Sequence, residues 1–131
     1  MSVETNRTVM MQYFESDHSD VSMMAEDVVF TDMATGQEHH GPDGVRQMLN
    51  YVYHIAFEAT AVPQNLIISE NNAVWEGDFI GKHIGEFAGI PATGKVVNVP
   101  LTIVYDLADG RITRARIYLM APVLMQQLGI T

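Results

Sequence analysis

The sequence predicts an α+β fold in which N-terminal helices lie against one face of a curved antiparallel sheet. Three observations support this prediction. Apolar residues recur with helical spacing in the first part of the chain, β-prone runs follow one another after Thr60, and Asp109-Gly110 is a strong hairpin signal between two of those runs. At 131 residues the chain has the length of one domain, which we expect to span residues 1–131.

Helical segments open the chain and one closes it. The first, over about 4–16, is amphipathic, and its apolar face carries Val9, Met10, Tyr13 and Phe14. The Asp-His-Ser-Asp segment 17–20 breaks this helix and supplies caps for a short second one over 21–26. A longer helix is predicted over about 42–58, because it begins with Pro and continues with helical periodicity. The last is a short helix over 122–128.

The β-prone runs are expected to form the sheet. A short run at 28–32 precedes the longer helix, and the others lie at 65–69, 73–87, 96–107 and 112–119. Strands that follow one another through short turns are typical of an antiparallel meander.

The run at 73–87 belongs to a stretch with glycine at every fourth position, namely Gly77, Gly81, Gly85 and Gly89. A helix is disfavoured there, because charged residues interrupt the pattern and each glycine would cost a helix ~1 kcal/mol relative to alanine. In a strand the glycines share one face with Trp75, Phe79, His83 and Phe87, and His83 is the only ionisable group on that face. Two interpretations remain open. The bare backbone forms the floor of a ligand pocket, or the glycines mark bulges that bend the sheet beneath helix side chains.

Composition excludes several classes of function. Seven basic against sixteen acidic residues give a net charge of −9, which disfavours binding to nucleic acid or to an anionic membrane surface. No apolar run approaches the ~20 residues of a membrane span, and the start lacks the layout of a signal peptide, so we expect a soluble cytoplasmic protein. There is no cysteine. His39 and His40 are adjacent and would point opposite ways in an extended segment, so no metal site is predicted.

Residues 83–95, His-Ile-Gly-Glu-Phe-Ala-Gly-Ile-Pro-Ala-Thr-Gly-Lys, resemble the His-x-Gly-x-Phe-x-Gly-x-Pro-x-Thr-Gly signature of the SnoaL-like polyketide cyclases. Segments 25–32, 41–45, 109–112 and 124–129 also fit that family, so the resemblance covers nearly the whole chain. The family belongs to the nuclear transport factor 2-like superfamily, which includes ketosteroid isomerase and limonene epoxide hydrolase. The resemblance implies a cystatin-like cone whose bent sheet and helices enclose one deep apolar pocket, on a scaffold that hosts many activities.

The resemblance also implies site residues. Asp32 falls where ketosteroid isomerase has its general base, and its strand pattern puts it on the same face as Val28 and Phe30. Facing an apolar cavity, the carboxyl group would have a pKa above ~3.9 and be a better base. His83 matches the acid–base histidine of the cyclases, and Tyr13 could act as the oxyanion-stabilising tyrosine of the isomerase does. Structural roles stay open for all three: turn capping by Asp32, and core packing by His83 and Tyr13.

Other residues are candidates for the pocket wall, and some expected acids are missing. The wall candidates are Met48, Trp75, Phe79, Tyr118 and Met120. The cyclases pair their histidine with an aspartate on the following strand, but segment 96–101 offers only Asn98 as a polar group. Met120 stands where the family often has an acid. The protonated aspartate of the isomerase oxyanion site falls near Thr102, which is a weaker donor.

These features predict a cofactor-free acid–base enzyme of the isomerase, cyclase or lyase kind. It would act on a small, mostly apolar carbonyl compound, with Asp32 abstracting a proton and His83 polarising or protonating the oxygen. The alternative is a non-catalytic module that binds a small molecule or mediates dimerisation, and the missing acids favour it. The resemblance further implies a homodimer.

Overall fold

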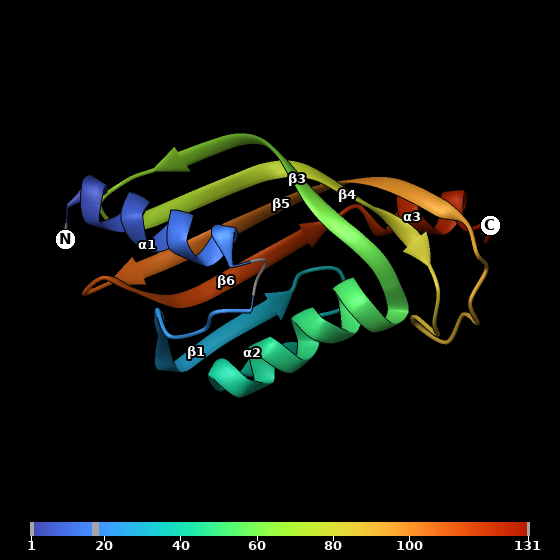
Figure 1. The fold of residues 1–131 in the computed structure, drawn as a ribbon, viewed down its shortest axis with the longest axis horizontal. Coiled ribbons are helices and arrows are strands. Elements are labelled where there is room, and N and C mark those ends of the chain that lie inside the picture. Colours follow the sequence, from blue (N-terminus) through green and yellow to red (C-terminus); the bar gives the residue numbers. More distant parts are fainter. Residues whose placement is uncertain (1, 17–18, 131) are drawn as a thin grey trace.

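The computed structural model describes residues 2–16 and 19–130. In chain order the elements are α1 (Val3–Glu15), β1 (Met24–Asp32), β2 (Glu38–His40), α2 (Gly41–Asn50), the π-helical segment η1 (Tyr51–Ala56), β3 (Phe57–Ile68), β4 (Asn72–His83), β5 (Val96–Ala108), β6 (Arg111–Leu119) and α3 (Ala121–Gln127). The termini of the chain lie at opposite ends of the molecule (Figure 1). No helix in the described part of the chain has the length and hydropathy needed to cross a membrane.

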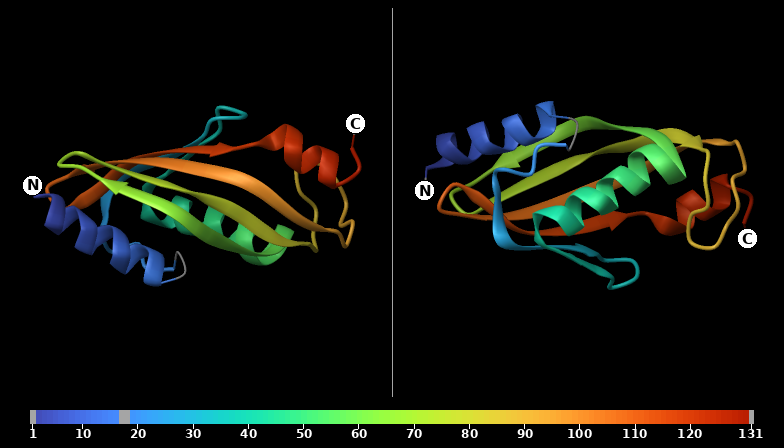
Figure 2. Two further views of the ribbon diagram at one scale, coloured as in Figure 1. Left: turned by 90° about the horizontal axis from the view of Figure 1, so that it is seen from above. Right: turned by 60° about the horizontal axis from the view of Figure 1, so that its bottom comes forward.

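The described strands form one curved sheet in the order β2-β1-β6-β5-β4-β3. Neighbouring strands are antiparallel except β1 and β6, which are parallel. Helices α1 and α2 lie on the same side of this sheet (Figure 2). The predicted α+β class is therefore confirmed. The sheet differs from the expected antiparallel meander in one pair of strands. Strand β1 pairs in parallel with β6, the last strand of the chain, and not with β3, the next long strand in sequence.

Helix α1 forms where the sequence predicts it. The Ser2 hydroxyl accepts a hydrogen bond from the Thr5 backbone N–H at 3.0 Å, which caps the helix, and Met10 and Tyr13 are fully buried. The predicted short helix over 21–26 is wrong, because β1 already begins at Met24 and pairs there with Ile112 of β6. Of the expected cap segment, residues 17 and 18 lie outside the described residues.

Several strand boundaries differ from the prediction, and β1 and β3 begin earlier than the predicted runs at 28–32 and 65–69. The helix predicted to end near Glu58 ends at Ala56, and β3 starts at once with Phe57 opposite His83. The three-residue strand β2 was not predicted, and β4 ends at His83 instead of Phe87. Each of these boundaries depends on which backbone groups find a partner strand. Local hydrophobic periodicity does not contain that information.

The predicted alternation along β4 is confirmed. All its odd-numbered residues from Ala73 to His83 are buried. The pocket-floor interpretation is wrong for Gly77, Gly81 and Gly85, because the backbone of β3 or, at Gly85, of η1 occupies the space beside them, whereas Gly89 has open space around it and a positive φ. A Cβ at Gly81 would lie 2.5 Å from the Cβ of Ala59, and one at Gly77 would overlap the backbone carbonyl of Val62. The bend is instead marked on β3, where a register shift between Pro63 and Asn65 lies opposite Gly77.

Aromatic side chains fill the interior between α1 and the sheet. The ring of Tyr105 lies 6.1 Å from those of Tyr13 and Phe30 and 6.0 Å from that of Phe14, measured between centroids. Trp75 is buried beside them, with its ring 6.5 Å from that of Phe14. Tyr13 and Trp75 therefore pack the core under α1, and the open space lies elsewhere under the sheet.

Candidate functional site

A cavity of about 740 Å³ lies between the α2–η1 helix, the inner face of the sheet and α3. Its volume is within the range of roughly 300–1,000 Å³ that is usual for small-molecule sites. Most of its wall is apolar and comes from Met48, Leu49, Val52, Tyr53, Phe79, Phe87, Leu101, Ile103, Ile117, Leu119, Leu124 and Met125. Polar residues gather where β1, β2, the turn between them and α2 meet it, namely Asp32, Thr35, Gln37, Glu38, His39, His40 and Gln47. The cavity suits a mostly apolar molecule with a polar group at one end.

Helix α3 closes the cavity beside β5. The side-chain amide of Gln127 accepts from the backbone N–H of Asn98 at 2.7 Å and donates to its carbonyl at 2.8 Å. The amide thus pairs with β5 as another strand would, beyond the point where β6 ends. This attachment fixes the helix that carries Leu124 and Met125 into the cavity wall.

Alternation along β5 and β6 decides which predicted wall residues reach the cavity. Leu101, Ile103, Ile117 and Leu119 line it. Thr102 and Tyr118 lie opposite each other between those positions, so they belong to the outer face. Tyr118 and Met120 are 44% and 50% exposed. The prediction of Thr102, Tyr118 and Met120 as pocket residues is therefore corrected, whereas Met48 and Phe79 do line the cavity.

Asp32 ends β1 on the inner face of the sheet, and its register partner on β6 is Ile117, which lines the same cavity. Its carboxylate Oδ1 accepts a hydrogen bond from the Ala34 backbone N–H at 2.9 Å. Asp32 therefore fits both interpretations. It lines the cavity, and one of its carboxylate oxygens caps the turn after β1. The other oxygen accepts no hydrogen bond from the described residues.

His83 is fully buried at the end of β4 and does not belong to the described cavity wall. Its ring stacks on Phe57 with centroids 5.0 Å apart, and Phe57 contacts Phe79 and Phe87, which do line the cavity. The imidazole Nδ1 accepts from the Thr93 backbone N–H at 3.2 Å, so the proton of the neutral ring lies on Nε2. Asp32 and His83 therefore do not share one wall, and an aromatic layer stands between His83 and the cavity.

His83 also joins β4 to the far end of the connection 84–95. Its backbone N–H donates to Lys95 at 2.9 Å and its carbonyl accepts from Gly94 at 3.0 Å. Replacing His83 by alanine is expected to lower the free energy of unfolding by about 2–4 kcal/mol, because it removes a buried ring and leaves the Thr93 N–H without its acceptor. Urea denaturation measures this loss. An unchanged midpoint would contradict the structural role.

Tyr13 is fully buried, and its hydroxyl lies near those of Tyr105 and Tyr53. Burial raises the pKa of both Tyr13 and Tyr105 well above the ordinary value, so both remain protonated. Of these three tyrosines, Tyr53 lines the cavity, whereas Tyr13 and Tyr105 are not part of the described wall. Tyr13 therefore stands outside the described wall, close enough to the cavity residue Tyr53 for an electrostatic interaction.

His39 is a wall residue that the sequence prediction did not include. It lies on β2 opposite Phe30, which places it on the inner face with Asp32. Burial lowers the pKa of its imidazole, the Asp32 carboxylate raises it, and His40 lowers it further. His40 is exposed and pairs with Glu38 at 3.2 Å. His39 and His40 occupy adjacent positions of β2 and so alternate between its two faces, although both contribute to the cavity wall at this edge of the sheet.

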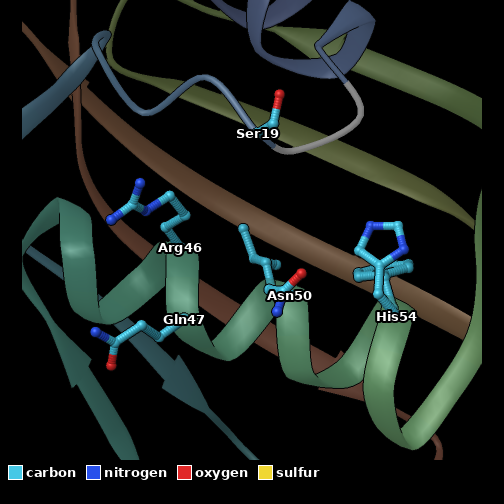
Figure 3. Close-up of a pocket in the computed structure, with 7 residues that line it drawn as sticks. Ser19, Arg46, Gln47, Asn50 and His54 are labelled. Carbon is cyan, nitrogen blue, oxygen red and sulfur yellow. The ribbon is translucent and has the colours of Figure 1, made fainter.

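A smaller cleft of about 390 Å³ lies between the α2–η1 helix and the segment that contains Ser19 (Figure 3). Arg46, Asn50 and His54 line it at intervals of four residues along the helix, and Leu49 and Tyr53 belong both to this cleft and to the larger cavity. Arg46 pairs with the exposed Asp43 at 3.0 Å. The two hollows therefore share a wall formed by one helix.

The fold and its cavity define a class of protein, the cone-shaped ketosteroid isomerase-like proteins. A protein with a ketosteroid isomerase-like fold from Catenulispora acidiphila, solved in complex with trimethylamine, superposes with a TM-score of 0.76 at 12% identity, over 94% of this chain and 93% of that one. TsrD from Streptomyces laurentii gives 0.81 at 19% identity, over 98% and 97%. A Jannaschia sp. CCS1 protein classed as a SnoaL-like polyketide cyclase gives 0.83 at 20% identity, over 98% and 94%.

The family model for SnoaL-like polyketide cyclases matches residues 11–128. The chain therefore belongs to the SnoaL-like polyketide cyclase family, with the nuclear transport factor 2-like cone that the sequence resemblance implied. No curated protein matches the sequence significantly.

Proposed function

We propose that this protein is a cofactor-free acid–base enzyme of the isomerase, cyclase or lyase kind that acts on a small, mostly apolar carbonyl compound. The observation that supports it is the position of Asp32, whose carboxylate lies at the wall of a largely apolar cavity of about 740 Å³. Membership of the cyclase family agrees with this class of chemistry. A ketone that fills such a site displaces water from around the carboxylate and can be held with one C–H bond directed at the base.

The reaction begins when Asp32 removes a proton from the carbon beside the carbonyl. The electron pair of the broken C–H bond forms the enolate, and the proton stays on the carboxyl group of Asp32. In an isomerase the proton returns to a different carbon of the enolate. In a cyclase the enolate carbon attacks a second carbonyl carbon of the same molecule, and the new alkoxide takes the proton from Asp32. In both cases the enzyme is restored and product and substrate are isomers.

The second candidate function is a non-catalytic small-molecule-binding or dimerisation module of the same fold. Its support is the composition of the inner wall of β5 and β6, where the described lining residues are apolar and Thr102 faces outward. A thermal-shift screen of apolar ketones followed by product analysis separates the two functions. Stabilisation together with conversion supports the enzyme, whereas stabilisation by ketones that are recovered unchanged supports the binding module.

We also propose that the protein is a homodimer formed through the outer face of the sheet. Exposed apolar side chains on that face include Val62, Val96 and Tyr118. Large apolar side chains exposed on the outer face of a sheet are available for contact with a second copy of the chain. Light scattering is expected to give twice the chain mass of 14.6 kDa, and Tyr118→Glu is expected to shift the protein towards the monomer. A wild-type mass of one chain at high protein concentration would contradict this.

A further inference from the structure

Strands β1 and β2 pair at the polar end of the cavity. His39 lies opposite Phe30, and the Asp32 backbone N–H donates to the Gln37 carbonyl at 2.9 Å. Asp32 and His39 are therefore diagonal neighbours on one face of an antiparallel pair, a position in which side chains are roughly 7 Å apart and within reach of a common group. Both residues line the cavity.

The surroundings of His39 keep its imidazole neutral and available. Burial lowers its pKa, so the ring is mostly uncharged at neutral pH and carries one N–H donor. The titratable groups that act on it are the carboxylate of Asp32 on β1 and the imidazole of His40 on β2, and Glu38, which belongs to the same part of the wall, pairs with His40. Helix α2, which packs against β2, contributes the neutral residues Gly44 and Gln47 to this part of the wall, and its charged Asp43 and Arg46 pair with each other.

We propose that His39, and not His83, is the group that holds the carbonyl oxygen of the substrate beside Asp32. This inference rests on the proposed function. As Asp32 takes the proton from carbon, negative charge develops on the carbonyl oxygen, and the His39 N–H donates a hydrogen bond to it. A donor already in position stabilises that charge more in the transition state than in the ground state. The proton stays on the imidazole, so no further acid is needed for the first step.

A pH titration of His39 tests whether its imidazole lies close to Asp32, and it needs no substrate. Nuclear magnetic resonance of the imidazole C–H protons gives the pKa of His39 in the wild type and in Asp32→Asn. Because the carboxylate favours the protonated ring, its removal is expected to lower the pKa of His39 further. Glu38→Gln is the matched control, because Glu38 lies on the same strand but pairs with His40, and it should shift the pKa of His39 less. Equal shifts in the two variants, or none in Asp32→Asn, would overturn the proposed pair.

The catalytic arm uses exchange of α-protons for deuterium in a series of apolar cyclic ketones of one to three rings. His39→Gln is expected to lower kcat for exchange roughly 100-fold, as loss of one oxyanion donor does, with a small change in KM. His83→Gln, compared at equal folded fraction, is expected to retain wild-type kcat. Full activity of His39→Gln alongside inactive Asp32→Asn would overturn the role of His39 and leave the proposed function standing. No exchange by the wild type would overturn both.

Discussion

Replacing Asp32 by asparagine is expected to reduce turnover roughly 100-fold or more, because general base catalysis contributes about 10²–10⁴ in rate and the other carboxylate of the described wall, that of Glu38, pairs with His40. The substitution preserves shape. The asparagine side-chain oxygen can still accept the Ala34 N–H that Asp32 accepts at 2.9 Å, so the turn after β1 should keep its conformation. Deuterium exchange into a bound ketone measures the loss.

Asp43→Asn is the control for this prediction. Asp43 is an exposed carboxylate in the first turn of α2 and pairs with Arg46 outside the larger cavity. Its removal changes the net charge of the protein by the same amount as Asp32→Asn does. We expect the control to exchange ketone at the wild-type rate. Equal rates for Asp32→Asn and the wild type would show that another group is the base.

Replacing Gly81 by alanine is expected to destabilise the protein by about 2–3 kcal/mol, the range for overpacking a tightly filled interior. The added Cβ would lie 2.5 Å from the Cβ and 2.6 Å from the Cα of Ala59, so the backbone of β3 would have to move away from β4. For a chain of this length the melting temperature should fall by roughly 10 °C. Differential scanning calorimetry measures the change.

Gly44→Ala is the matched control for Gly81→Ala. Gly44 lies inside α2, and a Cβ there would meet its nearest neighbour, the backbone carbon of His39, at 3.9 Å. An alanine in this helix should be neutral or stabilising by about 0.5–1 kcal/mol. If both variants melted at the same temperature, close packing of β3 on the glycine positions would not be the reason for those glycines.

The parts of the fold that follow local periodicity could be predicted from the sequence. The face of α1 that carries Tyr13, the alternation along β4 and the inward face of Asp32 all follow from spacing alone. Pairing between distant segments could not be predicted in the same way. Strand β2 has three residues, and its pairing with β1 is what brings His39 to the cavity.

The misplacement of His83 in the predicted site has a related cause. Alternation correctly assigns His83 to the inner face of β4, but it does not say what covers that position. The ring of Phe57 covers it, and Phe57 belongs to the part of β3 that was predicted to be helix. Thr102 and Tyr118 were assigned to the wrong face of β5 and β6. In a strand, an error of one residue in the assignment exchanges the inner and outer faces.

The proposed function requires that an apolar ketone bind in the larger cavity with its reactive carbon beside Asp32. A crystal structure of Asp32→Asn with a ketone that the wild type exchanges tests this directly, because the variant should hold the substrate without converting it. We expect the ring system to lie against Phe79 and Leu101, with the α-carbon about 3–3.5 Å from the side chain at position 32. A ketone bound instead in the cleft of Arg46 and His54, or with its carbonyl group turned away from residue 32, would contradict it.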